Sequence, residues 1–292
     1  MKDIVFLCVG GDSRQTYMSS ALSAYGKVYT LGIKTTTNDV INLDSLESME
    51  DKADILVLPI MKDNGLNIIF SDGKDVNCSD LVKRLKKNAI VTGGRLSTIQ
   101  IEYFSALGFD VTDYYKREEL VIKNCIPTAE GTLQISMQEL GTTIFGTDVL
   151  VIGYGRVGKT VAKLFKNVGA NVTVAARKLS SISSAEINKL NGIELKGMYG
   201  FISKFDLIIN TVPALIMTRE MLEAVSKDTL IIDLASKPGG VDFKAAEELN
   251  KKTIWALSLP GKFAPITSGK IIADAVRNIL LERGRKNVTE RN

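Results

Sequence analysis

The chain has 292 residues, of which 45% are apolar and 24% are charged, and its 37 lysines and arginines against 33 aspartates and glutamates give a net charge of +4. It contains no histidine, which excludes a Ser-His-Asp triad, a Cys-His pair and a histidine-ligated zinc site. The three cysteines, Cys8, Cys78 and Cys125, are too widely spaced for a metal or redox motif. We therefore expect a cytoplasmic α/β protein of two domains, without a metal, a nucleic-acid partner or a membrane span.

Short apolar runs alternate with helical patterns in the first part of the chain. Strands are expected at 4–9, 28–31, 54–59 and 89–92, with helices between them that include 13–25 and 79–87. Ser13 is a candidate N-cap for the first of these helices. Such alternation is typical of a mainly parallel sheet flanked by helices, and we predict this fold for a first domain, residues 1–125.

A second series of strands is expected at 148–153, 171–175, 206–210, 229–233 and 253–256. A helix from Pro127 to Leu140 is expected to precede it, since proline suits the first turn of a helix. Residues 126–262 are therefore predicted to form a linker helix and a Rossmann domain. In residues 263–292, an amphipathic helix at about 265–283 is expected to pack back on the first domain, followed by a frayed polar tail from Gly284.

The most specific motif is Gly153-Tyr154-Gly155-Arg156-Val157-Gly158, which follows an apolar strand and opens a helical pattern. In that setting the first glycine permits a tight turn, the second admits a pyrophosphate, and the third allows the helix to pack closely on the strand. Free N–H groups at the helix start would bind the phosphates. Gly153, Gly155, Arg156, Val157 and Gly158 are therefore predicted to bind a dinucleotide, the alternative being glycines that serve only a tight turn.

The residue that reads the cofactor's ribose is expected at the end of the following strand. Arg177 stands there, 177 − 153 = 24 residues after the first glycine, where NAD-binding domains carry an acid. Arg177, Lys178 and the hydroxyl group of Ser180 favour the 2′-phosphate of NADP. If Arg177 and Lys178 only form a solvated strand end, NAD remains an alternative.

Further loops are expected at the carboxyl ends of the second series of strands, where parallel sheets bind ligands. One begins with Asn210, another with Asp233, and a third contains Lys262. Lys262 could bind a substrate carboxylate or donate a proton, or it could be an exposed loop lysine that does neither. The loop residues predicted to contact the cofactor are Thr211, Val212, Pro213, Ala235 and Ser236.

Another anion-binding loop is expected after the first strand. Residues 10–15 read Gly-Gly-Asp-Ser-Arg-Gln and lack the third glycine of the dinucleotide motif. A small carboxylate held by Arg14 is therefore favoured over a nucleotide, with an arginine on a solvated first turn as the alternative. Gly93-Gly94-Arg95, at the end of another expected strand, has the same two interpretations.

Six segments of the sequence carry a resemblance to a known family: residues 10–15, Ile126–Gly131, Gly153–Gly158, Asn210–Ala214, Asp233–Gly240 and Leu259–Pro265. Through these segments the whole chain resembles the A subunits of dipicolinate synthase. Its second domain is more distantly similar to those of shikimate, methylenetetrahydrofolate and 2-hydroxyacid dehydrogenases, although the last group normally uses a histidine that this chain lacks.

The resemblance implies an oxidoreductase of the mother cell of a sporulating bacterium. It would convert dihydrodipicolinate, or a hydroxytetrahydro precursor, into pyridine-2,6-dicarboxylate with NADP or NAD. A flavoprotein-like B subunit would be its partner, and association of the chain with itself is left open.

For that chemistry we expect Arg14 and Lys262 to bind the substrate carboxylates and Thr128 to donate a hydrogen bond. Glu130 and Lys262 are the candidate catalytic residues, with Glu130 as a base or, alternatively, only a carboxylate in the first turn of the linker helix. Three other functions remain open: a non-catalytic NADP-binding regulatory subunit, a shikimate-type or methylenetetrahydrofolate-type dehydrogenase, and a scaffold or dehydratase for the hydroxylated precursor.

Overall fold

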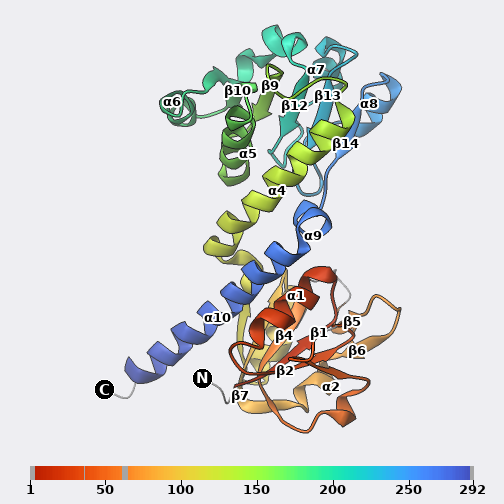
Figure 1. Ribbon diagram of the computed structural model, residues 1–292, viewed down its shortest axis with the longest axis vertical. Helices are drawn as coiled ribbons and strands as arrows, with labels where there is room; N and C mark the ends of the chain where they lie inside the picture. Colours follow the sequence, from red (N-terminus) through yellow and green to blue (C-terminus); the bar gives the residue numbers. More distant parts are fainter. Residues whose placement is uncertain (1–3, 36, 61–64, 290–292) are drawn as a thin grey trace. The chain divides into compact units, whose positions relative to one another are not determined.

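The computed structural model describes residues 4–35, 37–60 and 65–289. The chain divides into two compact units: residues 1–124 with 264–292, and residues 125–263. Helix α4 (Glu118–Glu139) carries the chain from the first unit into the second (Figure 1). Within the described ranges, no helix combines the length and apolarity that crossing a membrane requires.

The first unit is built on a six-stranded parallel sheet in the order β3-β2-β1-β4-β7-β8. A two-stranded hairpin and helices on both faces complete it. The sheet strands are β1 (Val5–Val9), β2 (Lys27–Leu31), β3 (Ile41–Leu43), β4 (Ala53–Ile60), β7 (Leu85–Gly94) and β8 (Asp110–Asp113). The other elements are β5 (Asn67–Ile69), β6 (Asp75–Asn77), α1 (Ser13–Leu22), η1 (Leu46–Ser48), α2 (Cys78–Val82), α3 (Thr98–Ala106), η2 (Tyr114–Lys116) and α10 (Pro265–Thr289).

Both faces of this sheet are covered, which explains why its central strand β1 is apolar and buried along its whole length. Along β1, Val5, Leu7 and Val9 pack into one core cluster, and Phe6 and Cys8 pack into another on the opposite face. The second cluster includes residues of α1 and α10. These two helices approach closely at Gly269, where a Cβ atom would lie 2.5 Å from the carbonyl oxygen of Arg14. The predicted terminal helix therefore packs on α1.

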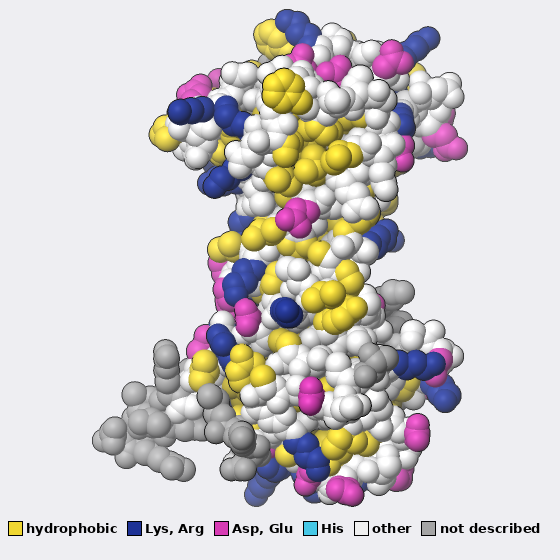
Figure 2. Space-filling view, in the orientation of Figure 1, with side chains coloured by type: hydrophobic (Ala, Val, Ile, Leu, Met, Phe, Trp, Pro, Cys, Tyr) yellow, Lys and Arg dark blue, Asp and Glu magenta, His cyan; other side chains and the backbone are white. Residues whose placement is uncertain are grey.

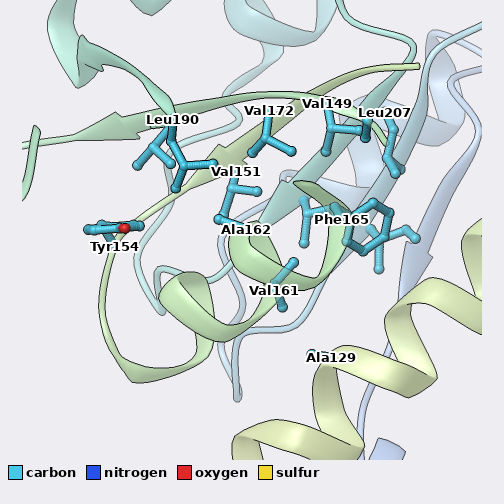
Figure 3. Packing of buried hydrophobic residues seen from close by; sticks show 14 of the residues in the cluster. Ala129, Val149, Val151, Tyr154, Val161, Ala162, Phe165, Val172, Leu190 and Leu207 are labelled. Carbon is cyan, nitrogen blue, oxygen red and sulfur yellow. The ribbon is translucent and has the colours of Figure 1, made fainter. Parts of the chain in front are cut away.

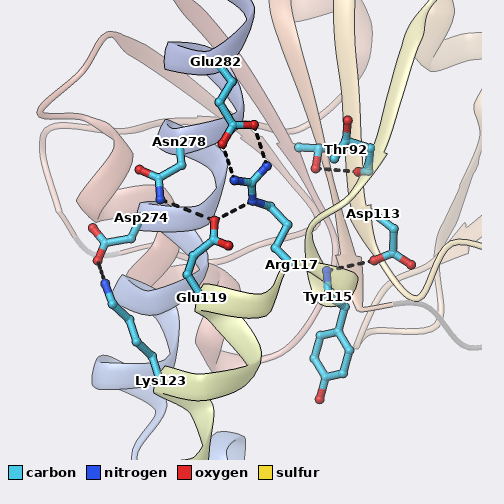
Figure 4. Close-up of polar contacts among 10 residues, drawn as sticks. Thr92, Asp113, Tyr115, Arg117, Glu119, Lys123, Asp274, Asn278 and Glu282 are labelled. Carbon is cyan, nitrogen blue, oxygen red and sulfur yellow. Dashed lines mark hydrogen bonds and ion pairs between the residues drawn. The ribbon is translucent and has the colours of Figure 1, made fainter.

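Ion pairs attach the first turns of α4 to α10 within the first unit (Figure 4). The Arg117 guanidinium donates to both carboxylate oxygens of Glu282 and to Glu119, and Lys123 donates to Asp274. These contacts raise the pKa of Arg117, chiefly through its hydrogen bonds to Glu282. The start of α4 is thus held by partners far away in the sequence.

The second unit repeats the topology of the first, with six parallel strands in the order β11-β10-β9-β12-β13-β14. This order is the Rossmann arrangement, in which successive strands are added first on one side of the first strand, β9, and then on its other side. The strands are β9 (Asp148–Ile152), β10 (Asn171–Ala176), β11 (Asn191–Glu194), β12 (Leu207–Asn210), β13 (Leu230–Asp233) and β14 (Thr253–Trp255). The helices are α5 (Arg156–Asn167), α6 (Leu179–Ile187), η3 (Leu195–Lys204), α7 (Arg219–Ala224), α8 (Phe243–Glu248) and α9 (Leu259–Phe263), with the later part of α4.

Strand β9 runs through the middle of the second core. Val149 and Val151 pack with Val161 and Phe165 of α5 (Figure 3), and Leu150 and Ile152 face the cluster on the other side of the sheet. All of these side chains are fully buried. The carboxyl end of β9 is therefore a rigid base for the loop that follows it.

The predicted fold class of two mainly parallel α/β domains is confirmed, but some boundaries were wrong. Helix α4 begins at Glu118 rather than at Pro127, which lies inside it, because the ion pairs with α10 stabilise the additional turns. Only Cys78–Val82 of the helix expected at 79–87 forms, since Leu85 already belongs to β7. Helix α10 continues to Thr289 where a frayed tail was expected from Gly284, and the last three residues of that tail lie outside the described range.

Candidate nucleotide-binding site

The turn between β9 and α5 packs tightly against the loop that follows β12. Gly153 has a φ of +94°, and a Cβ atom there would lie 2.5 Å from Thr211 Oγ1. A Cβ on Gly158 would lie 2.2 Å from the carbonyl oxygen of Gly153. The Thr211 hydroxyl donates to the carbonyl of Ile152 at 2.9 Å, which ties the two loops together. The protein's own packing therefore requires glycine at 153 and 158.

Gly155 differs from the other two glycines because the protein leaves space around it. It is the exposed N-cap residue of α5 and provides no side-chain cap, and nothing lies within 4 Å of an ideal Cβ built there. A helix end that lacks a side-chain cap offers its N–H groups and partial positive charge to an anion. Arg156 is exposed at this end and Val157 is half-buried against the core. These features fit the diphosphate of a dinucleotide.

Tyr154, the second residue of the turn, anchors it in the core. Its ring lies among the buried residues of the cluster that contains Leu190 (Figure 3). Burial raises the pKa of its hydroxyl group. The ammonium of Lys159 lies 5.5 Å from the ring centroid, in a cation–π contact. The turn is thus anchored by the buried ring of Tyr154, and the next residue, Gly155, is exposed to solvent.

The carboxyl end of β10 presents cations to solvent. Arg177, Lys178 and Ser180 are all exposed, and neither cation forms an ion pair with another described residue. An acid is nevertheless present nearby, because Glu194 at the end of β11 is paired in register with Ala176 of β10 and is exposed. Sequence reasoning missed Glu194, whose place on this edge depends on the pairing of two strands.

A buried polar network holds the loops after β12 and β13. The Asp233 carboxylate accepts hydrogen bonds from the Asn210 side chain at 2.8 Å, from the Ala235 N–H at 3.0 Å and from the Gly240 N–H at 2.8 Å. The Asn210 amide also bonds both backbone groups of Val212. Asp233 is 1% exposed and Asn210 is 0% exposed. Both act on the site through the shape of the loops.

The predicted cofactor residues on these loops lie above this network. Thr211 and Val212 are half-buried, Pro213 and Ser236 are exposed, and Ala235 is buried. The carbonyl of Ala235 accepts a hydrogen bond from the Trp255 indole at 2.9 Å, so that residue is fixed from both sides. Trp255 is the single tryptophan of the chain and could be noticed in the sequence for that reason, but nothing in the sequence indicates that it binds the carbonyl of Ala235.

Two helices of the second unit carry the predicted catalytic residues and, apart from Arg14, the predicted substrate-binding residues. Helices α4 and α9 approach closely at Gly131, where a Cβ would lie 3.0 Å from Phe263 Cδ2 and 3.2 Å from Leu259 Cβ. Glu130 and Lys262 are exposed on these helices, and Thr128 is half-buried. Glu130 is not a first-turn carboxylate, since it stands 130 − 118 = 12 residues after the start of α4.

In the first unit, the start of α1 is closed by the chain's own carboxylate. Asp12, not Ser13, is the N-cap, and Asp12 and Gln15 form a capping box. The Asp12 carboxylate also accepts hydrogen bonds from two nitrogens of the Arg14 guanidinium, Nε at 2.9 Å and Nη2 at 2.6 Å. A carboxylate suits this cap because it serves the helix N-terminus and the guanidinium together. Arg14 is therefore buried and paired, and its substrate role stays a prediction.

The Asp12–Arg14 pair should make stability depend on pH. Burial opposes ionisation of Asp12, but hydrogen bonds and the charge of Arg14 outweigh it, and the pKa of Asp12 lies below its usual 3.8. A lowered pKa stabilises the fold above pH 3.8, and the contribution is lost as the pH falls through the folded-state pKa. In urea unfolding, the free energy of unfolding of wild type should exceed that of Asp12→Asn by a constant amount at about pH 5 to 7. The difference should disappear in acid. A difference that persists in acid would contradict this role.

Known proteins resemble both units. Residues 5–115 match the N-terminal domain of the A subunit of dipicolinate synthase, and residues 126–236 match the NAD-binding domain of D-isomer specific 2-hydroxyacid dehydrogenases. The chain is 32% identical over 287 residues to the dipicolinate synthase A subunit of Bacillus subtilis (strain 168), covering 94% of this chain and 95% of that protein. The second unit is thus an NAD-binding domain of the dehydrogenase type.

Solved structures extend this similarity to the whole fold. The crystal structure of the dipicolinate synthase A subunit from Bacillus halodurans matches with a TM-score of 0.86 at 29% identity, covering 96% of this chain and 98% of that one. The corresponding structure from Bacillus subtilis also has a TM-score of 0.86, at 28% identity and 98% coverage of both chains. A transhydrogenase from Sinorhizobium meliloti, at 14% identity and a TM-score of 0.69, shares the fold. The resemblance inferred from sequence is confirmed, and the chain belongs to the family of dipicolinate synthase A subunits.

Proposed function

We propose that the chain is an NADP-dependent oxidoreductase that forms pyridine-2,6-dicarboxylate from dihydrodipicolinate or its 4-hydroxytetrahydro precursor. It would act with a B subunit in the mother cell of a sporulating bacterium. The observation that carries the proposal is the open N-terminus of α5 at Gly155, in a chain whose second unit matches a dehydrogenase NAD-binding domain. That helix end suits a dinucleotide diphosphate.

Bound nicotinamide would supply the hydride acceptor, and the protein's residues would hold the reactants. Gly155 would give the diphosphate its close approach, with the N-terminal N–H groups of α5 as donors, and Gly153 and Gly158 would hold the turn in shape. Thr211, Val212, Pro213, Ala235 and Ser236 follow β12 and β13 on the same edge of the sheet. The Asn210–Asp233 network fixes the shape of those loops before the cofactor binds.

Oxidation of the dihydro acid removes a hydride from one ring carbon and a proton from its neighbour, and aromaticity is gained. The 4-hydroxytetrahydro precursor would first lose one water molecule to give the dihydro acid. Glu130 or water would take the proton, and the ring would need only modest help from a base. Arg14 and Lys262 would bind the two carboxylates, with a hydrogen bond from Thr128. The lack of histidine argues against alcohol oxidation in the manner of 2-hydroxyacid dehydrogenases, which normally use a histidine.

Arg177→Ala should weaken NADP binding and leave NAD binding nearly unchanged. The exposed guanidinium at the end of β10 suits a 2′-phosphate, which only NADP carries. The expected loss is about tenfold in the dissociation constant, measured by calorimetry with both nucleotides. Lys163→Ala, which removes an exposed cation from α5, is the matched control and should change the affinity for neither nucleotide. Tighter binding of NAD than of NADP by wild type would contradict the assignment and direct attention to Glu194.

The function is tested by supplying either acid to the chain with each nucleotide, with and without the B subunit. Reduced nucleotide and pyridine-2,6-dicarboxylate should appear together in equal amounts. Nucleotide binding without turnover in the complete mixture would indicate a regulatory role. Product without nucleotide reduction would indicate a dehydratase or scaffold, and turnover only with shikimate or a folate would indicate the corresponding dehydrogenase.

A further inference from the structure

The end of β7 exposes an arginine that the proposed function leaves without a role. In the segment Gly93-Gly94-Arg95, a Cβ on Gly93 would lie 2.5 Å from Leu96 Cδ2, and one on Gly94 would lie 2.8 Å from Tyr114 Cε2. Because neighbours fill both positions, Arg95 is the first residue of this segment that projects a side chain into solvent. It stands at the carboxyl edge of the first sheet, where sheets of this topology bind ligands.

The backbone at Arg95 is strained and specifically held. Its φ is 55°, in the left-handed region that costs a residue other than glycine about 1 kcal/mol. Its N–H donates to Asp113 Oδ1 at 3.1 Å. The same oxygen accepts from the Tyr115 N–H at 2.8 Å, a contact drawn in Figure 4. Asp113 thus binds the backbone of the arginine, and the guanidinium stays exposed. Strain retained in this way is common at ligand-binding positions.

The guanidinium lies over an aromatic ring and has no carboxylate partner. Its central carbon is 4.9 Å from the Tyr115 ring centroid, and within the described residues it forms no ion pair. Arg14, by contrast, already shares its charge with Asp12, whose carboxylate oxygen lies 2.6 Å from the Arg14 guanidinium. A carboxylate ligand gains most from a guanidinium whose fork is unoccupied, and here that is Arg95.

Buried polar groups lie behind Arg95. The Gln15 side chain is 1% exposed and contacts the Tyr114 hydroxyl. Tyr114 donates to the carbonyl of Leu58 at 3.1 Å, and its ring lies beside Gly94. These fully buried groups fix the backbone from which the Arg95 side chain projects.

We propose that Arg95 binds one carboxylate of the substrate through both arms of its guanidinium. The ring of Tyr115 supports the guanidinium from below. The inference rests on the proposed function, because it takes the ligand to be an aromatic dicarboxylate. Arg14 would have to give up its ion pair with Asp12 in order to bind a carboxylate, whereas Arg95 would not. The strained backbone at 95 is then the cost of presenting this cation at the sheet edge.

Arg95→Gly separates binding from stability. Glycine relieves the positive φ, so the variant should unfold at the same or a higher temperature than wild type. Titrated with benzene-1,3-dicarboxylate or pyridine-2,6-dicarboxylate, with and without NADPH, it should bind about tenfold more weakly or worse. Arg95→Lys should recover only part of the affinity, since lysine lacks the planar fork. Lys116→Ala, which removes an exposed cation from η2, should bind as wild type does.

Equal affinity in wild type and Arg95→Gly, or an equal loss in Lys116→Ala, would overturn the inference. So would a wild-type chain that binds neither dicarboxylate with or without NADPH. Failure of the proposed function looks different: nucleotide binding or turnover would be absent while the affinity for dicarboxylates still depended on Arg95.

Discussion

Replacing Gly155 by valine should strongly weaken nucleotide binding and leave the fold intact. In the protein alone, no atom lies within 4 Å of an added Cβ, and the φ of −80° suits any residue. The loss of stability should therefore stay within about 1 kcal/mol, the cost of a poorer N-cap. The branched side chain would project where the diphosphate approaches the start of α5. We expect the dissociation constant for NADP, measured by calorimetry, to rise roughly 10- to 100-fold.

Gly158→Ala is the counterpart that should damage both properties. The added methyl group would meet the Gly153 carbonyl oxygen at 2.2 Å, a backbone atom that cannot move without shifting β9 or α5. We expect about 3 kcal/mol less stability in urea unfolding, together with loss of nucleotide binding. If Gly155→Val binds NADP as wild type does, the phosphates do not lie at the start of α5. If Gly155→Val is destabilised as much as Gly158→Ala, glycine is required at 155 for folding and not for nucleotide binding.

The sequence predicted the nucleotide turn well because its requirements are local and steric. Three glycines at fixed spacing, after an apolar strand and before a helix, leave few alternatives, and the structure places Gly153 and Gly158 in contacts that only glycine permits. The same holds for the central strands β1 and β9, which carry apolar residues on both faces and cannot lie at a surface. Short strands such as β3 and β11 depend on their neighbours and were missed.

Other features could not be read from a local pattern. Helix α4 starts at Glu118 because Arg117 meets Glu282, 165 residues away, and no periodicity in the sequence reports such a partner. Arg95 shows its positive φ only in three dimensions. The cap of α1 was a misinterpretation instead, because Asp12 and Gln15 have the spacing of a capping box and Ser13 does not fit it.

Removal of the Asp233 carboxylate should cause the largest loss of stability in the second unit. Asp233→Ala would leave the Asn210 amide and the N–H groups of Ala235 and Gly240 without their acceptor, in a place that is almost fully buried. Each unsatisfied buried donor costs about 1–3 kcal/mol, so we expect about 4 kcal/mol in all, measured by urea unfolding. Asp228→Ala, which removes an exposed carboxylate from the same unit, should cost less than about 0.5 kcal/mol.

This network also connects stability to the site, because the two loops that it joins carry predicted cofactor residues. The Gly240→Ala variant tests the connection by steric means, since its Cβ would lie 2.1 Å from Asn210 Nδ2 and force the loops apart. Both variants should weaken NADP binding at temperatures where the chain is still folded, as the loops carrying Thr211 and Ala235 lose their shape. If Asp233→Ala is destabilised but binds NADP as wild type does, the network supports the sheet alone. In that case the loops after β12 and β13 would not form part of the nucleotide site.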